Sequence, residues 1–500
     1  MVDPLTRLAI LHGTDKFGMH DYTPVYHALL AEHRDKPLKL LEIGIGGYDD
    51  PHAGGESLAM WRDYMPNADI VALDIAAKEL DLGPRVTLVQ GSQVDPDVIA
   101  RLIADHGPFD VIVDDGSHDN AHVWESFRML FPALKPGGLY LVEDVQTAFF
   151  LRLGGSITMT APNTIGSFGS LMLDLGRPGA ELPAGPVISR IDRMHNIIAI
   201  CTAEAGAAPE TLPLAPGSAA QAVGRAGLWG IELSEPRVEQ GDPALWEDHV
   251  ALRDRLDQLA DGDALAIPGW PAQVAPILNL FQQIDHVEQA VPFPHVQPVE
   301  AAPLVIHMSG FRDGVLLVKG PNDYPSNFHF HFASERARTA FQWLNDLLCD
   351  PSEQLAPPLS QYALMLDVLD RAHRHASAPP LLRRVLQLGR ADAEIAAFGL
   401  IAAARAGCWP EAAAVTQLAL RDHDDAVLHA MMSWSLTKIQ AHRGDARRVL
   451  GLDPEADDDT LNAAILSICD AAPQPEGVMA TALAYLRHDL GVGAYPLQVG

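Results

Sequence analysis

The sequence predicts an α/β fold with a doubly wound parallel sheet at its N-terminal end, then a small α+β region and an all-α C-terminal region. Three observations support this. Short apolar runs alternate with helical patterns through residue 144, as in parallel strands joined by helices. A proline-rich, small-residue stretch at 204–220 has the composition of a linker. Residues 351–500 are alanine-rich and almost wholly helical in pattern.

Five buried parallel strands are expected at 38–47, 68–75, 85–91, 109–115 and 137–144. Each is a short apolar run with helical spacing in the segment that follows, so right-handed crossovers should place the helices on both faces of one sheet. Residues 186–203 contain two further strands, expected to close the sheet as an antiparallel edge. Residues 151–186 are rich in Gly, Pro and Ser and indicate a loop over the site, with a short helix near 170–176.

Three domains are therefore expected, at 1–210, 221–350 and 351–500. The second is an α+β accessory domain with a hairpin-like pair of strands at 304–320. The third is helical; its helix pair at 393–420 has a tetratricopeptide-like pattern, but no clean 34-residue period follows.

Charge and composition exclude several classes of partner. The chain has 35 Lys and Arg against 65 Asp and Glu, a net charge of -30, which disfavours nucleic acid and anionic membrane surfaces. Its four cysteines are scattered, without the spacing of a zinc site, and fit a reducing compartment. No signal-peptide pattern and no apolar run of about 18 residues is present, so a cytoplasmic location is expected.

A glycine-rich turn, Glu42-Ile43-Gly44-Ile45-Gly46-Gly47, closes the first predicted strand. Glycines such as Gly44 and Gly46 let the backbone turn sharply and approach a ligand closely. Alone, this turn is compatible with NAD, a flavin or S-adenosylmethionine, or with a tight turn that binds nothing.

Further features favour S-adenosylmethionine over a dinucleotide. Asp74 ends the second strand, where a carboxylate can accept hydrogen bonds from a ribose diol. Ser92 and Gln93 follow the third strand, where the adenine edge lies in class I methyltransferases, and the 134–138 segment (LKPGG) is typical of that Rossmann-like fold. The polar insert at 48–57 brings Ser57 to the cofactor end of the sheet, where it could bind the methionine part.

Four acids end the fourth and fifth strands: Asp114, Asp115, Glu143 and Asp144. These strands should be neighbours about 4.8 Å apart, and ligands bind outside such strand ends. Carboxylates this close repel unless a cation neutralises them, and an all-oxygen site suits Mg²⁺ first, with Ca²⁺ or Mn²⁺ possible. We expect Asp115, Glu143 and Asp144 as metal ligands and Asp114 towards the cofactor. The alternative is that some of them cap helices or bind the cofactor.

His118 follows Asp115 by three residues, at the start of the next predicted helix. A neutral imidazole facing the acidic cluster can take a proton from a substrate hydroxyl, so His118 is the candidate general base. His122, one turn later, is its rival.

These motifs resemble the metal-dependent sugar O-methyltransferases of macrolide biosynthesis, the mycinamicin 2''-O-methyltransferase type. The resemblance covers residues 12–26, 40–66 and 109–147 and, weakly, 192–200, about two fifths of the chain, and departs from the family after Thr147. It implies Mg²⁺ at Asp115, Glu143 and Asp144, with His118 as the base. It also implies a homo-oligomer and cofactor contacts from Thr14, Tyr22, Glu42, Gly44, Ser57, Asp74 and the surroundings of Asp114.

The predicted function is S-adenosylmethionine- and metal-dependent O-methylation of a sugar hydroxyl on a glycosylated small molecule or glycan. One alternative is a non-catalytic S-adenosylmethionine-binding scaffold whose helical C-terminal region binds a protein partner. The other is a Rossmann oxidoreductase, which the LKPGG segment disfavours.

Overall fold

The computed structural model describes residues 2–17, 20, 22–156, 163–194, 196–213, 237–274, 276–277, 280, 305–320, 335–350, 357–423, 425–472 and 477–492. The chain divides into two compact units, Val2–Ala337 and Arg338–Gly500 (with Met1 grouped with the second), and each is described by itself.

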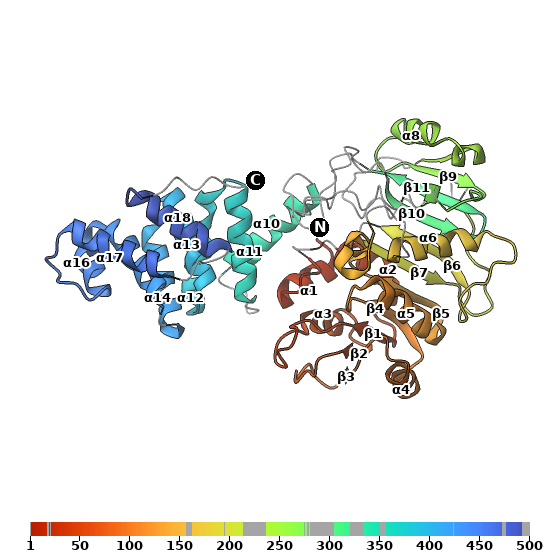
Figure 1. Ribbon diagram of the computed structural model, residues 1–500, viewed down its shortest axis with the longest axis horizontal. Helices are drawn as coiled ribbons and strands as arrows, with labels where there is room; N and C mark the ends of the chain where they lie inside the picture. The colour runs from red at the N-terminus through yellow and green to blue at the C-terminus, as the bar shows by residue number, and fades with distance from the viewer. Residues whose placement is uncertain are drawn as a thin grey trace. The chain divides into compact units, whose positions relative to one another are not determined.

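One sheet forms the centre of the first unit, and its described strands follow the order β3-β2-β1-β4-β5-β7-β6-β10-β11-β9-β8 (Figure 1). The first five strands along the chain are parallel and pair as β3-β2-β1-β4-β5. They are β1 (Lys39–Ile43), β2 (Asp69–Asp74), β3 (Val86–Gln90), β4 (Phe109–Asp114) and β5 (Leu134–Val142). The five predicted parallel strands are confirmed, with boundaries that differ by a few residues at most.

Helices connect these strands as the doubly wound pattern requires. They are α3 (Glu56–Tyr64), α4 (Pro96–His106) and α5 (Asn120–Leu130), while α1 (Pro4–His12) and α2 (Thr23–Leu30) precede the sheet. Asp95 and Asp119 cap α4 and α5, because each side chain accepts hydrogen bonds from backbone N–H groups of the first turn. The cap at Asp119 places His118 just before α5, at the carboxyl end of β4.

The second half of the sheet is mainly antiparallel. Here β7 (Ile197–Thr202) pairs with β5 and β6 (Ile188–Met194), and β6 pairs with β10 (Val305–Phe311). The sheet continues through β11 (Gly314–Lys319) and β9 (Ala264–Pro268) to β8 (Val238–Gln240), which runs parallel to β9. The expected hairpin at 304–320 is therefore present as β10 and β11.

This arrangement differs from the expected separate domain at 221–350 and from the expected sheet edge at 186–203. Residues of β10 occupy the free edge of β6, with Gly310 opposite Ile191. Because β10 and β11 are buried along their whole length, they complete the sheet of the first unit rather than build a core of their own. Residues 221–236, 281–304 and 321–334 of the expected domain lie outside the described residues.

The segment after β5 crosses the carboxyl end of the sheet. Two short 3-10 helices, η3 (Val145–Phe149) and η4 (Leu151–Leu153), precede α6 (Thr164–Leu175). Buried Asn120 holds them: its Nδ2 donates to the carbonyl oxygens of Thr147 and Leu153, 3.0 and 2.8 Å away, and its Oδ1 accepts from Thr164 N. The helices η3 and η4 and the start of α6 therefore lie beside the N-terminus of α5.

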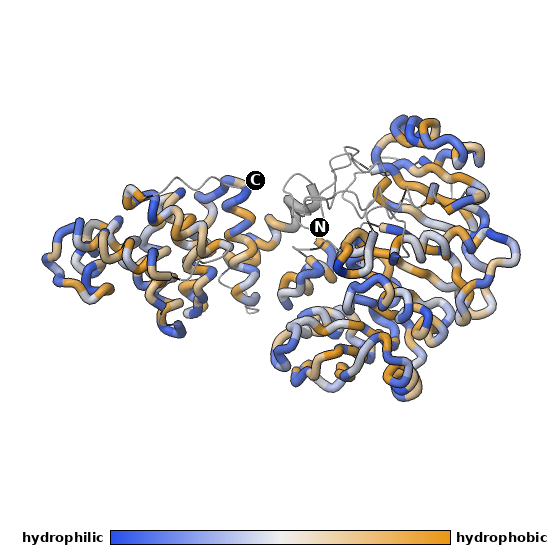
Figure 2. The backbone as a smooth tube through the Cα atoms, in the orientation of Figure 1, coloured by the Kyte–Doolittle hydropathy of each residue, from blue (hydrophilic) through white to orange (hydrophobic). Residues whose placement is uncertain are grey.

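The second unit is helical in its described part. After α10 (Glu335–Cys349), which begins in the first unit, it contains α11 (Leu359–Arg371), α12 (Ala378–Leu388), α13 (Ala393–Ala406), α14 (Trp409–Asp422), α15 (Ala426–Thr437), α16 (Arg443–Val449), α17 (Asp458–Ala471) and α18 (Gly477–Asp489). Figure 2 shows apolar residues recurring along these helices, with hydrophilic ones between. Consecutive helices from α13 to α16 pack against each other, which confirms the predicted all-α region. Within the described residues, no helix is long and apolar enough to cross a membrane.

Candidate functional site

A cavity of about 980 Å³ lies at the carboxyl ends of β1, β2 and β4. Most of the predicted site residues line it, namely Thr14, Gly44, Gly46, Ser57, Asp74, Ser92, Gln93, Asp115, His118 and Asp144. Four others, Tyr22, Glu42, Asp114 and Glu143, are buried behind its wall and are not part of the lining. The predicted residues thus form an inner and an outer layer.

The glycine turn after β1 approaches the backbone of the β4 end. Gly44 has φ +94°, and a Cβ at this position would lie 2.1 Å from the carbonyl oxygen of Asp115. No other residue type fits there without moving the end of β4. The close approach explains the glycine and shapes the floor of the cavity.

Asp74 is oriented by the backbone that follows β1 and β2. Its Oδ2 accepts a hydrogen bond from Ile45 N and its Oδ1 accepts one from Ala76 N, each at 2.8 Å. Each carboxylate oxygen retains a further lone pair, which is the acceptor that a ribose diol needs.

Asp114 differs from its predicted place towards the cofactor. Side chains alternate along β4, so Asp114 points to the opposite face from its neighbours and lies 1% exposed beside Gln93 and Tyr140. Burial raises the pKa of its carboxyl to about 7. Gln93, which bridges Asp114 and Ser117 N, connects this buried acid to the cavity wall.

Glu42 and Tyr22 are also behind the wall. Glu42 accepts a hydrogen bond from Ser57 Oγ at 3.1 Å, and burial raises its pKa to about 7 although Lys16 lies nearby. Tyr22 donates its hydroxyl to Asp144. Their contacts are therefore with residues that line the cavity.

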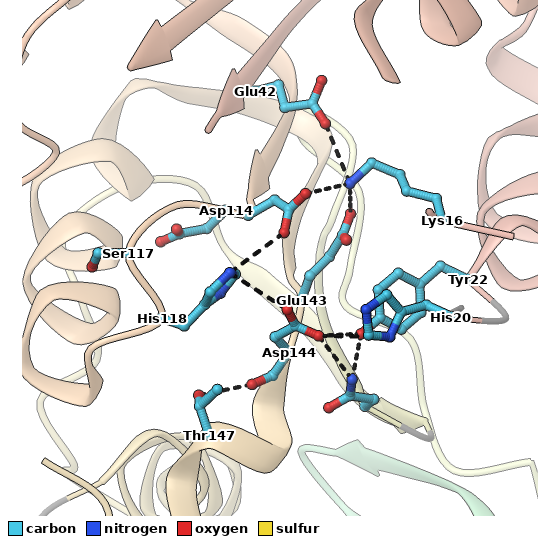
Figure 3. Close-up of polar contacts among 12 residues, drawn as sticks. Lys16, His20, Tyr22, Glu42, Asp114, Ser117, His118, Glu143, Asp144 and Thr147 are labelled. Atoms are coloured by element: carbon cyan, nitrogen blue, oxygen red, sulfur yellow. Dashed lines mark hydrogen bonds and ion pairs between the residues drawn. The ribbon is translucent and has the colours of Figure 1, made fainter. Parts of the chain in front are cut away.

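Asp115, His118 and Asp144 form the one group in the described part of the chain whose ligand atoms could hold a metal ion, all lying within 4.8 Å of one another. His118 Nε2 is 3.4 Å from Asp144 Oδ2 and 3.9 Å from Asp115 Oδ1 (Figure 3). Two carboxylate oxygens from adjacent strands thus face the same imidazole, as their place at neighbouring strand ends predicts.

The other oxygen of Asp144 is surrounded by donors. Asp144 Oδ1 accepts from Tyr22 Oη at 2.6 Å, Asn196 Nδ2 at 3.0 Å and Gln146 Nε2 at 3.2 Å. Burial alone would raise the pKa of Asp144, but the charges of His20 and His118 and these hydrogen bonds outweigh it and hold the pKa well below its usual range. Asp144 is thus kept as a carboxylate with Oδ2 directed at His118.

Glu143, the third predicted metal ligand, faces the interior. Its Oε1 accepts from Lys16 Nζ at 2.7 Å and from Tyr26 Oη at 2.5 Å, and its side chain is 1% exposed. Burial raises its pKa well above the usual range, with a further contribution from Asp115. Lys16 also donates to Asp115 Oδ2 at 2.6 Å and lies 3.4 Å from Glu42 (Figure 3). Burial lowers the pKa of this ammonium, but the surrounding carboxylates reverse the effect and raise it.

Backbone strain concentrates at this site. Among the described residues, five other than glycine have positive φ, and three of them, Tyr48, His118 and Asp144, line the cavity. A fourth, Asn196 in the turn between β6 and β7, hydrogen-bonds Asp144. Such conformations cost about 1–3 kcal/mol each and persist where surrounding contacts determine them, which is common at functional sites.

Lys16, Tyr26, Gln146 and Asn196 were not predicted as site residues. Lys16 and Tyr26 precede the sheet in sequence, and only the fold brings them to the strand ends. One signal was available: four clustered acids need positive charge, and Lys16 lies within the 12–26 segment that resembles the sugar methyltransferases. Asn196 lies in the turn between β6 and β7, within the 192–200 segment that resembles the same methyltransferases only weakly.

Comparisons with known proteins agree with this architecture. Residues 49–145 match a family described as a methyltransferase domain. The chain is 43% identical over 198 residues to the 8-demethyl-8-alpha-L-rhamnosyl tetracenomycin-C 2'-O-methyltransferase of Streptomyces olivaceus, covering 39% of this chain and 52% of that protein. It is 43% identical over 152 residues to the mycinamicin VI 2''-O-methyltransferase of Micromonospora griseorubida, covering 30% and 38%.

A solved structure also matches, that of the MycE methyltransferase of the mycinamycin biosynthetic pathway in complex with Mg and SAH. It is 33% identical with a TM-score of 0.39, covering 44% of this chain and 60% of that one. The chain spans about half the length, or less, of the curated sugar methyltransferases it matches. The family match at 49–145 and the curated relatives together place the N-terminal part of this chain in the methyltransferase domain family, among relatives that methylate sugars.

Proposed function

We propose that this protein transfers a methyl group from S-adenosylmethionine to a sugar hydroxyl of a glycosylated small molecule or glycan, with the help of a divalent metal, Mg²⁺ first. The observation that carries the proposal is the convergence of Asp115 Oδ1 and Asp144 Oδ2 on His118 at the edge of the cavity. The relatives are named as sugar O-methyltransferases, which supports the choice of acceptor class.

The residues fit a hard divalent cation. Asp115 and Asp144 each have one oxygen fixed by protein donors and one directed at the cavity edge. Oxygen ligands of this kind suit Mg²⁺, which usually takes one or two carboxylates and leaves other positions to water or substrate. We therefore propose Asp115 and Asp144 as the ligands and place Glu143, predicted earlier as a third, in the supporting layer with Lys16 and Tyr26.

The cavity also fits the cofactor. The carboxylate of Asp74 would accept hydrogen bonds from the ribose, the open backbone at Gly44 and Gly46 allows close approach, and Ser92 and Gln93 stand where the adenine edge is expected. Thr14 and Ser57 line the same cavity and would contact the methionine part.

Methyl transfer requires a hydroxyl that can act as a nucleophile and an acceptor held in line with the methyl group. A bound divalent metal lowers the pKa of a coordinated hydroxyl and orients it. His118, held in position by its backbone turn before α5, takes the hydroxyl proton at Nε2. Asp144 Oδ2, 3.4 Å away, stabilises the imidazolium that results. The fixed positions of these groups contribute through proximity.

The test of activity uses the purified chain with S-adenosylmethionine and a panel of rhamnosyl and other deoxyhexosyl glycosides, read by mass spectrometry for methylated product. We expect product with Mg²⁺, its loss with EDTA and its return when Mg²⁺ is restored. Turnover that is unchanged by EDTA and by Asp144→Asn would overturn the metal-dependent function.

Cofactor binding is tested separately by calorimetry with S-adenosylhomocysteine. Asp74→Asn removes one carboxylate oxygen and should weaken binding about tenfold or more, given the usual 1.5–3 kcal/mol for hydrogen bonds to charged groups. Asp69→Asn, at the exposed opposite end of β2, is the matched control and should bind as the unaltered chain does.

A second candidate function is a non-catalytic S-adenosylmethionine-binding scaffold whose helical C-terminal unit binds a protein partner. The separate compact unit at Arg338–Gly500 favours it. Tight S-adenosylhomocysteine binding with no methylated product from any hydroxylated acceptor would support this candidate. A homo-oligomer, in which a neighbouring subunit completes the site, also belongs to the proposal and is tested by sedimentation.

A further inference from the structure

Lys16 is an ammonium buried beside the carboxyl groups of three acids. Its Nζ lies 2.6 Å from Asp115 Oδ2, 2.7 Å from Glu143 Oε1 and 3.4 Å from Glu42 Oε1, and its side chain is 1% exposed. Among the described residues, no other Lys or Arg forms an ion pair with these three acids. Lys16 lies behind the cavity wall rather than in the lining.

We propose that Lys16 is a positioning residue for the metal site. By holding Asp115 Oδ2, it leaves Asp115 Oδ1 as the oxygen directed at His118 and at the cavity. It also donates to Glu143 Oε1, so the same ammonium fixes the carboxyl group beside Asp115. This inference rests on the proposed metal-dependent function.

The backbone around Lys16 explains how a residue outside the sheet reaches the strand ends. Gly13 ends α1 in the left-handed conformation, with φ +77°, and turns the chain towards the sheet. Thr14 Oγ1 accepts from Lys16 N at 3.4 Å, and Lys16 O accepts from Tyr22 N at 3.0 Å. The same segment thus brings Lys16 to Asp115 and Tyr22 to Asp144.

The two proposed ligands are oriented in the same way from this segment. Lys16 holds Oδ2 of Asp115, and the Tyr22 hydroxyl holds Oδ1 of Asp144. In both carboxylates the remaining oxygen is the one nearest to His118 Nε2. Partners behind a metal ligand commonly fix its orientation, and their loss costs about 10–100-fold in metal affinity.

The test measures binding of Mn²⁺, a probe for the divalent site, by calorimetry and electron paramagnetic resonance on the full chain without acceptor. Lys16→Met keeps the length of the side chain and removes its charge. We expect Mn²⁺ to bind at least about tenfold more weakly. Lys16→Arg, which keeps the charge and the donors, should recover much of the affinity.

The direction in which the Mn²⁺ affinity of Lys16→Met changes distinguishes a positioning role of Lys16 from other roles. If Lys16 acted only by its charge, its removal would reduce repulsion of the cation and tighten Mn²⁺ binding. If it served only to stabilise the fold, Mn²⁺ affinity of the folded variant would be unchanged. Either outcome would overturn the proposal.

The matched control is Lys135→Met. Lys135 pairs with Asp110 at 2.7 Å, at the opposite ends of the same two strands that carry Asp115 and Glu143. This variant should bind Mn²⁺ as the unaltered chain does. Equal weakening in Lys135→Met would show a general effect of losing a lysine and would overturn the specific role of Lys16.

Lys16→Met leaves buried carboxylates without a counter-ion and can fail to fold. The double variant Lys16→Met with Glu42→Gln also replaces the acid beside Lys16 that is not a predicted metal ligand, so a loss of Mn²⁺ affinity still reports on Lys16. We expect the double variant to fold and still to bind Mn²⁺ weakly. An Mn²⁺ affinity equal to that of the unaltered chain would overturn the proposal that Lys16 positions the metal ligands. An unaltered chain that binds no Mn²⁺ would overturn the metal-dependent function itself, and this inference with it.

Discussion

His118 Nε2 and Asp144 Oδ2 lie 3.4 Å apart, and both residues have a left-handed backbone, with φ +55° and +53°. One precedes α5 and the other follows β5, so two strained turns from different connections bring these side chains together. The Asp119 cap stabilises the backbone conformation next to His118, and the donors to Asp144 Oδ1 stabilise that of Asp144. The pair is therefore held in place before any ligand binds.

His118→Gln tests the role of the imidazole as the base. We expect turnover to fall by about 10²–10⁴-fold, because glutamine cannot take the proton, while Mn²⁺ affinity stays within about threefold. His122→Gln is the control for the neighbouring rival, which bonds Ser117 Oγ, and should retain most of the turnover. A parallel loss of Mn²⁺ binding in His118→Gln would instead make His118 a metal ligand.

Single carboxylate variants test which acids hold the metal. Asp115→Asn and Asp144→Asn should each weaken Mn²⁺ binding by at least about tenfold, as expected when a ligand loses its charge. Glu143→Gln should stay within about threefold, because Glu143 is outside the group of Asp115, His118 and Asp144 whose ligand atoms converge. Calorimetry measures the Mn²⁺ affinity of each variant. A large loss of Mn²⁺ affinity in Glu143→Gln would show that Glu143 is a metal ligand after all.

Gly44→Ala and Gly83→Ala form a matched pair, because both glycines have positive φ, at +94° and +84°. A Cβ at Gly83 meets nothing within 4 Å, so this variant should lose only about 1 kcal/mol through backbone strain. A Cβ at Gly44 would overlap the carbonyl of Asp115 and displace the end of β4. We expect Gly44→Ala alone to lose S-adenosylhomocysteine and Mn²⁺ binding; equal effects in both variants would contradict the close approach.

Glu42 makes the stability of the first unit depend on pH. Its pKa is raised from 4.5 to about 7 in the folded protein, so the folded state favours the protonated carboxyl. The resulting stability is complete below about pH 4 and is lost as the pH rises through about 7, up to about 3 kcal/mol. Glu42→Gln mimics the neutral form at every pH. The melting temperature of the unaltered chain should therefore fall, relative to Glu42→Gln, between pH 5 and pH 8, and a constant difference would contradict the shift.

The parallel part of the sheet could be predicted because its signals are local. Each strand is a continuous apolar run, and the acids and glycines follow at its carboxyl end, where the topology brings them together. Asp115, His118 and Asp144 were placed in one cavity for this reason.

The other features of the fold and the site depend on contacts between residues far apart in the sequence. No local pattern in a single sequence shows which distant segments pair. The linker-like composition after residue 204 suggested a new domain, but β10 pairs with β6 across more than a hundred residues. The direction in which the Asp114 and Glu143 side chains point depends on the alternation at the carboxyl end of β4 and β5, where a shift of one position reverses the direction. Lys16 reaches its partners only after the segment before β1 folds over the strand ends.

The continuous sheet has a consequence for dissecting the protein into fragments. A fragment that ends at residue 210 would contain every residue proposed for chemistry. It would lack β10, so the backbone groups of Ile191–Met194 in β6 would lose their hydrogen-bond partners in the sheet. Such an open, apolar strand invites pairing with other copies and precipitation. A soluble catalytic fragment should instead end near Ala337, where the first compact unit closes.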